Sequence, residues 1–139
     1  YPKVKLIVLG DGPYKSKLLK IKKKNKLKNL KILGFIKNPI KHLIESDLLI
    51  CTSKSEGISR SVLEALFYGV PVMTSNVDGS TEIIKNYENG FVFNNEQIFL
   101  SNFKKVLKWS SKFNKKRRCL LPYKLRQNYV SSIYLNNLY

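Results

Sequence analysis

The sequence predicts an α/β fold, with a Rossmann-like parallel sheet covered by helices on both faces. Short, continuous apolar runs alternate with longer segments whose apolar residues recur at helical spacing. Strands that are apolar throughout are buried on both faces, which is typical of parallel sheets. Of the 139 residues, 43% are hydrophobic, which is enough for the core of one domain.

The first strand and helix are predicted within residues 4–25. Residues 4–9 are rich in apolar side chains and predict a strand. Gly10 and Gly12 allow the chain to turn tightly after that strand, and Pro13 suits the first position of a helix. The helix is expected over residues 14–25, with its apolar residues inward and many lysines outward.

The same alternation continues to residue 110. Short apolar runs predict four more strands, at residues 30–33, 47–51, 70–74 and 91–93. Helical spacing and start signals predict helices at residues 39–46, 79–84 and 96–109, and a further helix that follows the polar loop within residues 53–66 and ends at Gly69. We interpret residues 1–110 as one ligand-binding domain, because strands that alternate with helices in this rhythm form a parallel sheet.

The last thirty residues have a different character. Residues 112–118 are mostly basic, Pro122 interrupts the pattern, and residues 123–139 are predicted to form an amphipathic helix. We therefore assign residues 111–139 to a basic segment followed by a C-terminal helix.

The central stretch of the chain is residues 53–66, which follow the strand at 47–51. A small polar loop leads there into the start of a helix, where backbone N–H groups lack partners within the helix and can bind an anion. Two carboxylates, Glu56 and Glu64, bracket this helix start. The stretch is the first candidate for a binding site.

Each of these two carboxylates has a structural alternative. Arg60 and Glu64 are four residues apart on the outer face of the helix, so an exposed ion pair explains Glu64 equally well. Glu56 precedes the helix beside Gly57, where a carboxylate favours the positive end of the helix dipole and leaves the loop backbone accessible. For Glu64, a role in the candidate binding site and a role in an exposed ion pair with Arg60 both remain open at this point.

The charge of the chain points to anionic partners. Lysine and arginine number 26 against 9 acidic residues, and the formal net charge is +17. Nucleic acid, anionic lipid and phosphorylated substrates all fit this imbalance. A solvated lysine surface without any partner fits it equally well.

Several classes of site are disfavoured. Cys51 and Cys119 have no spacing typical of a disulfide or a zinc site, and His42 is the only histidine, which argues against a Ser-His-Asp triad or a histidine-based metal site. We therefore expect no metal and no cofactor. No apolar run reaches the roughly 18–20 residues that a membrane-spanning helix needs.

The motifs of the chain resemble a known enzyme family. Glu56-Gly57-Ile58-Ser59 precedes a second glutamate at position 64, and the pattern Ala-Leu-x-x-Gly-x-Pro-Val follows. This order resembles family 4 of the retaining glycosyltransferases, the glycosyl transferases group 1. Four further motifs stand in the family's order, namely residues 10–13, 34–36, 78–84 and 89–91. The resemblance covers residues 4–110 and implies a GT-B architecture, of which this chain is the C-terminal, donor-binding half.

The resemblance also implies roles for individual residues. Glu56 is the catalytic residue of this assignment and bonds the hydroxyls of the donor sugar, whereas Glu64 accepts hydrogen bonds from the ribose. The remaining donor-binding residues are those near the sugar, Gly57, Ile58 and Ser59, those near the diphosphate, Ser61 and Val62, and Ile36, whose backbone meets the base. No catalytic nucleophile is implied, because the protein mainly positions the donor and stabilises charge.

The implied function is metal-independent transfer of a hexose-like sugar from a nucleotide sugar to a cell-surface glycan or a lipid-linked acceptor. The resemblance implies a preceding strand and helix and an N-terminal acceptor domain that these residues lack, so we expect the chain alone to be inactive. A cytoplasmic location is expected, with the inner face of the cytoplasmic membrane as a further candidate. The alternatives are a GT-B sugar-nucleotide epimerase and a non-catalytic basic module for RNA or anionic membrane. Nucleic acid is disfavoured, because the sequence has no RNA-binding aromatic signature.

Overall fold

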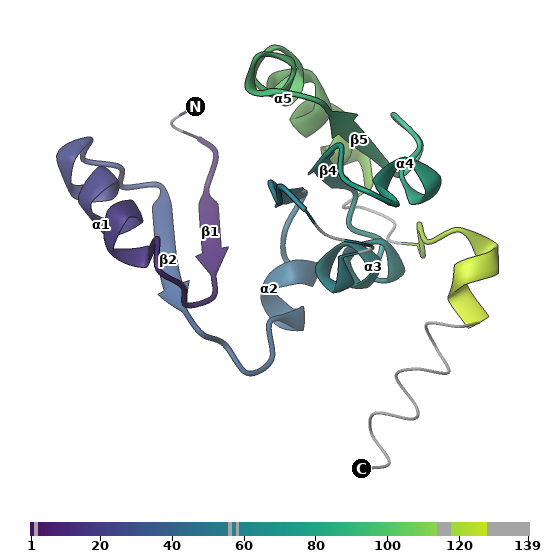
Figure 1. Ribbon diagram of the computed structural model, residues 1–139, viewed down its shortest axis with the longest axis horizontal. Coiled ribbons are helices and arrows are strands. Elements are labelled where there is room, and N and C mark those ends of the chain that lie inside the picture. The colour runs from purple at the N-terminus through teal and green to yellow at the C-terminus, as the bar shows by residue number, and fades with distance from the viewer. Residues whose placement is uncertain (2, 56, 58, 114–117, 128–139) are drawn as a thin grey trace. The chain divides into compact units, whose positions relative to one another are not determined.

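The computed structural model describes residue 1 and residues 3–55, 57, 59–113 and 118–127. The chain divides into two units, Tyr1–Pro39 and Ile40–Tyr139. Figure 1 draws the elements of both units along the chain. Each unit has its own parallel sheet.

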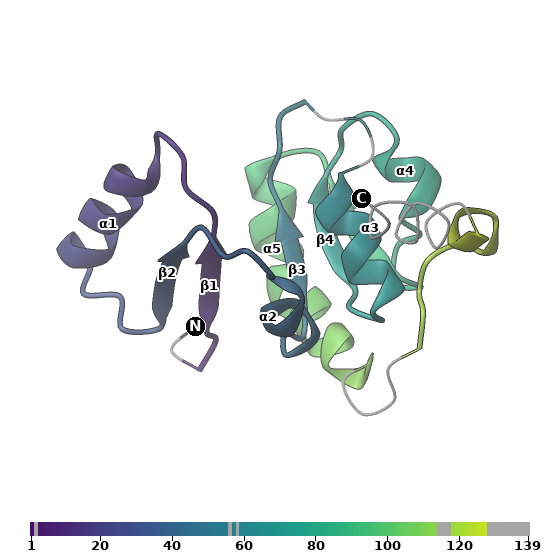
Figure 2. The ribbon, with the colours of Figure 1, turned by 90° about the horizontal axis from the view of Figure 1, so that it is seen from below.

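The first unit is one strand–helix–strand motif. It consists of β1 (Leu6–Leu9), α1 (Lys15–Lys24) and β2 (Leu30–Gly34). β1 and β2 are parallel, with Leu6 opposite Leu30. α1 packs against β2, as Figure 2 shows. This motif confirms the strand, turn and helix predicted over residues 4–25.

The second unit holds a three-stranded sheet in the order β3-β4-β5, with all strands parallel. Helices alternate with the strands, as the sequence predicts for parallel neighbours. The elements are α2 (Ile40–Ile44), β3 (Leu49–Cys51), α3 (Arg60–Phe67), β4 (Val72–Ser75), α4 (Ser80–Ile83), β5 (Gly90–Phe93) and α5 (Glu96–Ser110), followed by a 3-10 helix, Ser111–Phe113.

The β3-β4-β5 sheet is covered on both faces. Val72 of β4 belongs to a buried cluster with Leu66 of α3, whereas the next residue, Met73, belongs to a second cluster with Val106 of α5. Neighbouring residues of a strand point to opposite faces of its sheet, so α3 and α5 lie on opposite sides, as seen in Figure 1. The prediction of helices on both faces is confirmed for this sheet.

The strands form two sheets, where the sequence led us to expect one. Hydrogen bonds join β1 to β2, and β3 to β4 to β5, and no ladder among the described residues connects the two groups. The physical reason for the difference is that an apolar run identifies a strand from local side chains. The identity of the neighbouring strand depends on pairing between distant segments, which no local pattern specifies.

The described part of the C-terminal segment, residues 118–127, packs against the core of the second unit and contributes one buried residue to it. The side chain of Leu121 is fully buried, and the N–H of Leu120 donates to the carbonyl of Leu66 at 2.7 Å. Residues 123–127 are helical, as predicted. Residues 114–117 of the basic run and residues 128–139 of the predicted helix lie outside the described residues, and the predicted boundary at residue 110 stays a prediction.

Asn89 joins three segments of the second unit through its buried side chain. Its Oδ1 accepts from the N–H of Lys85 at 2.8 Å, and its Nδ2 donates to the carbonyls of Ile83 and Leu120 at 2.9 and 3.3 Å. The sequence suggested only a turn at Asn89-Gly90. The side chain therefore also supplies partners for buried backbone groups, which would otherwise be costly to leave unpaired.

In the part of the chain that the structure describes, no helix combines the length and the apolarity that crossing a bilayer requires.

Candidate functional site

The candidate site lies where β3 and β4 end and where α3 and α4 begin. Ligands of open parallel sheets bind at the carboxyl ends of the strands, because the loops and helix starts meet there. A narrow pocket of about 10 Å³ opens at this edge. It is lined by Cys51, Gly57, Ser59, Val62, Thr74, Val77, Gly79, Ser80 and Ile83. Three predicted donor-binding residues, Gly57, Ser59 and Val62, are thus brought together.

The start of α3 leaves its first turn available to an anion. Ser59 is the N-cap residue, but its side chain makes no capping hydrogen bond. Its Oγ lies 2.9 Å from the Oγ of Ser61, so two hydroxyls face each other at the helix start. The first turn contains no acidic residue that would compete with a bound anion. The N–H of Val62 donates to the carbonyl of Ser59 at 3.0 Å. The diphosphate roles of Ser61 and Val62 stay predictions.

Gly57 lies in the exposed loop before α3. A Cβ added to Gly57 would meet nothing within 4 Å, so the chain itself leaves that space open. The space is available to a ligand that approaches the loop backbone closely. Glu56 and Ile58, on either side of Gly57, lie outside the described residues, so the catalytic role of Glu56 and the donor-binding role of Ile58 stay predictions.

Glu64 forms the ion pair that the sequence left open. Its Oε1 lies 3.1 Å from the Nε of Arg60, and the side chains are 16% and 79% exposed, respectively. Because Arg60 is mostly in solvent, the pair contributes little to stability and is easily broken. The Glu64 carboxylate is largely covered and lies one turn inside α3. The ion pair is therefore present, and the ribose-binding role stays a prediction.

Two serines that the sequence analysis did not single out hold the loops of this site. The Oγ of Ser75, at the end of β4, donates to the carbonyl of Ser53 at 2.6 Å. The Oγ of Ser80 donates to the carbonyl of Val77 at 2.7 Å. The sequence did contain a signal for these contacts. Each serine lies at a strand end or a helix start, where serine side chains often form hydrogen bonds to nearby backbone groups.

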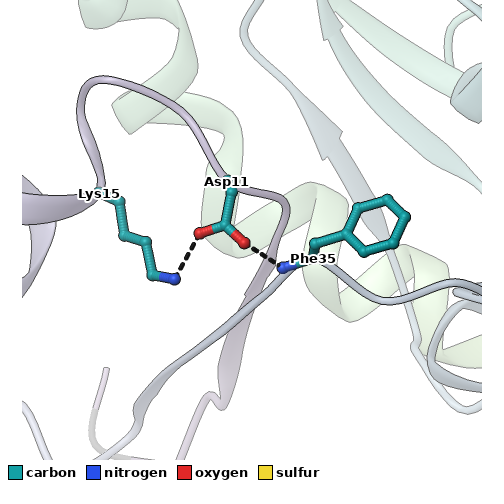
Figure 3. Close-up of polar contacts among 3 residues, drawn as sticks. All are labelled: Asp11, Lys15 and Phe35. Atoms are coloured by element: carbon teal, nitrogen blue, oxygen red, sulfur yellow. Dashed lines mark hydrogen bonds and ion pairs between the residues drawn. The ribbon is translucent and has the colours of Figure 1, made fainter.

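In the first unit, Asp11 connects the loops that follow β1 and β2. Its Oδ2 accepts a hydrogen bond from the backbone N–H of Phe35 at 2.6 Å, and its Oδ1 pairs with the Lys15 ammonium (Figure 3). The Lys15 hydrogen bond, followed by the Phe35 hydrogen bond, lowers the pKa of the Asp11 carboxyl below its usual value. In the sequence, residues 10–13 predicted a tight turn into a helix and gave no signal for the contact between Asp11 and Phe35.

Gly34 allows this connection to form. Its φ is +72°, and an added Cβ would lie 2.9 Å from the Nζ of Lys15 and 3.1 Å from the Oδ2 of Asp11. The carbonyl of Gly34 also accepts from the N–H of Gly10 at 2.7 Å. Asp11 therefore fixes the backbone beside Ile36, the residue predicted to meet the donor base.

The predicted donor-binding residues fall in both units. Ile36, half-buried, belongs to the first unit, and Gly57, Ser59, Ser61, Val62 and Glu64 belong to the second. The described residues contain no group of three or more histidine, cysteine or acidic side chains that could hold a metal ion.

Sequence comparison places these motifs among glycosyltransferases. Residues 1–119 match the model of the family described as glycosyl transferases group 1. The chain is 42% identical over 86 residues to an uncharacterised glycosyltransferase of Methanocaldococcus jannaschii, a match that covers 60% of this chain and 21% of the relative. It is 32% identical over 97 residues to poly(ribitol-phosphate) alpha-N-acetylglucosaminyltransferase of Staphylococcus aureus. This match covers 68% of this chain and 20% of the relative.

Solved structures agree on the fold. The crystal structure of TarM matches with a TM-score of 0.77 and 26% identity, over 96% of this chain and 28% of that chain. HepE of Anabaena in complex with UDP matches with a TM-score of 0.66 and 22% identity, over 96% and 42%. These neighbours are GT-B glycosyltransferases.

The chain spans about a fifth of the length of the two sequence relatives described above. Within that span, the family match, the fold and the order of the motifs all agree. The chain therefore belongs to the group 1 glycosyltransferase family.

Proposed function

We propose that this chain is the donor-binding half of a retaining GT-B glycosyltransferase. In this proposal it holds a nucleotide sugar, and the whole enzyme transfers a hexose-like sugar to a cell-surface glycan or a lipid-linked acceptor. The carrying observation is the start of α3, where an uncapped first turn and two facing hydroxyls follow a parallel strand. Two solved structures support the choice of donor, because HepE was crystallised with UDP and with UDP-glucose.

The start of α3 would receive the diphosphate of the donor. Backbone N–H groups of its first turn and the Ser61 hydroxyl present hydrogen-bond donors, and the positive end of the helix dipole favours the anion. When the sugar leaves, negative charge accumulates on the diphosphate. The fixed N–H and hydroxyl groups stabilise this extra charge more than they stabilise the intact nucleotide sugar. The proposal needs no metal for this step.

The remaining contacts orient the sugar and the nucleoside. Glu56 would bond the sugar hydroxyls, with Gly57, Ile58 and Ser59 passing close to the sugar. Glu64 would leave Arg60 and accept hydrogen bonds from the two ribose hydroxyls, since a carboxylate can accept both at once. The backbone at Ile36 would meet the base, on a loop that Asp11 holds through Phe35.

Transfer requires an acceptor site as well. Because the chain spans about a fifth of those sequence relatives, we expect these 139 residues to bind the donor and to leave transfer to the whole enzyme, acceptor domain included. We place that enzyme in the cytoplasm, where nucleotide sugars are the donors.

Calorimetric titration of the chain with UDP, GDP and a short RNA, each at two salt concentrations, tests the proposal. Binding of a nucleoside diphosphate that survives the higher salt, and that EDTA does not change, is the expected result. Binding of RNA alone, lost at the higher salt, would instead favour a basic binding module. A Gly57→Val variant, which fills the open space at the loop, should bind the nucleotide sugar less well and UDP almost as well.

A further inference from the structure

The positive charge of the chain is concentrated in the first unit. Residues 1–39 contain twelve lysines and a single acidic residue, Asp11, and so carry eleven of the 17 net positive charges. The other hundred residues combine 14 basic with 8 acidic side chains. Asp11 is itself paired with Lys15. A composition that favoured lysine everywhere would spread the excess evenly, so its position needs a local explanation.

Four of these twelve lysines lie on the outer side of α1. Lys17, Lys20, Lys23 and Lys24 are exposed, and their spacing places them on one side of the helix; we call them the α1 lysine face. No residue of α1 is buried. Within the described residues, the ion pairs join Lys15 to Asp11 and Arg60 to Glu64, so the α1 lysine face has no carboxylate partner.

Large apolar side chains border the α1 lysine face. Leu19 is 47% exposed and lies one turn from Lys23, and Tyr14, just before the helix, is 70% exposed. The Nζ of Lys17 lies 5.9 Å from the centre of the Tyr14 ring. Lysines that alternate with exposed leucine and tyrosine are typical of helices that lie in the headgroup region of a bilayer.

A lipid surface fits these features better than nucleic acid does. Single-stranded nucleic acid is bound in grooves that combine basic residues with several aromatic stacking platforms. The outer side of α1 is a convex helix surface, and Tyr14 is the one aromatic ring that the described residues place beside its lysines. A flat anionic bilayer can contact such a surface along its length.

We propose that the α1 lysine face docks on the surface of an anionic lipid bilayer. Each lysine that reaches the surface adds roughly fivefold to the affinity, so four together suffice for reversible binding without an anchor. The inference does not depend on the proposed function. If that function also holds, docking would keep the donor domain in the plane where a lipid-linked acceptor diffuses.

Vesicle co-sedimentation of the full chain tests the proposal. The vesicles contain phosphatidylcholine alone, or with about one third phosphatidylglycerol, at about 0.05 and 0.5 M salt. We expect binding only to the anionic vesicles, and loss of that binding at the higher salt. The test variant replaces the α1 lysine face by glutamine (Lys17→Gln, Lys20→Gln, Lys23→Gln, Lys24→Gln). The control replaces four exposed lysines of the second unit and has the same net charge (Lys41→Gln, Lys85→Gln, Lys104→Gln, Lys108→Gln).

The α1 variant should lose at least about tenfold in vesicle affinity, and the control should lose much less. A thermal melt of both variants shows whether the fold is kept. Equal losses of vesicle affinity in the two variants would overturn the proposal, because binding would then depend on total charge and not on the α1 lysine face. A wild-type chain that stays in the supernatant with anionic vesicles at low salt would also overturn it. RNA that binds the α1 lysine face and displaces the vesicles would assign the surface to nucleic acid instead.

Discussion

The carboxylate of Asp11 accepts a hydrogen bond from the backbone N–H of Phe35 at 2.6 Å, across 24 residues of sequence. The contact joins the loop after β1 to the loop after β2, and Ile36 follows directly on that second loop. A side chain outside the predicted site thus sets the backbone of a residue inside it.

Replacing Asp11 by alanine should weaken UDP binding severalfold. Without Asp11, fewer molecules hold the loop after β2 in the conformation proposed to meet the base, and the apparent affinity falls with that fraction. Hydrogen exchange at the Phe35 amide should become faster in the same variant. The control is Lys17→Ala in α1, where the lysine ammonium lies near the Tyr14 ring, and it should change neither quantity. Faster exchange at Phe35 with unchanged UDP affinity would show that the loop does not bind the base.

The pKa of Asp11 should respond to Lys15. Carbon-detected NMR titration should find the carboxyl pKa below its ordinary value of 3.8, and Lys15→Met should raise it while the Phe35 hydrogen bond keeps part of the shift. Because the folded-state pKa is lowered, the stabilising contribution is present above 3.8 and is lost as pH falls through the lower folded value. A titration curve that Lys15→Met leaves unchanged would contradict the ion pair.

Glu64→Gln should weaken the free energy of UDP binding by about 1–3 kcal/mol, the range for a lost hydrogen bond to a charged group. The matched control is Arg60→Gln, which breaks the 3.1 Å ion pair but keeps the carboxylate. If Glu64 binds ribose, only the first variant weakens binding. If the ion pair is its whole role, UDP affinity stays the same in both variants, and each loses only a small amount of stability.

Asn89→Ala should lower the free energy of unfolding by about 2–3 kcal/mol, because it removes a partner from the buried carbonyl of Ile83 and from the partly buried N–H of Lys85. Chemical denaturation measures the loss. Asn86→Ala is a useful comparison, since Asn86 is exposed and its side chain accepts one hydrogen bond, from the N–H of Val92. An equal and small loss in both variants would show that burial of Asn89 adds nothing.

Local patterns predicted the elements well. The helix expected over residues 96–109 is found at Glu96–Ser110, and the helix expected over residues 14–25 is found at Lys15–Lys24. The candidate site followed from the same kind of information, because Gly57 and Ser59 lie between a strand and a helix that the sequence identifies. Periodicity and helix-start signals act within a few residues, which is the range over which a sequence can be interpreted directly.

The contacts that escaped prediction link distant residues. Asn89 meets the carbonyl of Leu120, 31 residues later, and Asp11 meets Phe35 after 24. Neither residue type specifies its partner, because asparagine and aspartate near a turn usually bond their own local backbone. The division of the strands between two sheets escaped for the same reason.

The segment from Arg118 to Leu121 completes the core, although it lies beyond the last strand. Leu121 is fully buried, and the Arg118 carbonyl lies 2.6 Å from where a side chain on Gly69 would begin. A stop codon after Phe113 would therefore spare every residue of the candidate donor site and still yield a protein that cannot close its interior. The family match ends at residue 119, two residues short of that leucine. The segment that matches the family and the segment needed to bury the core therefore end at different residues. Truncation between the two ends would lower the stability of the fold.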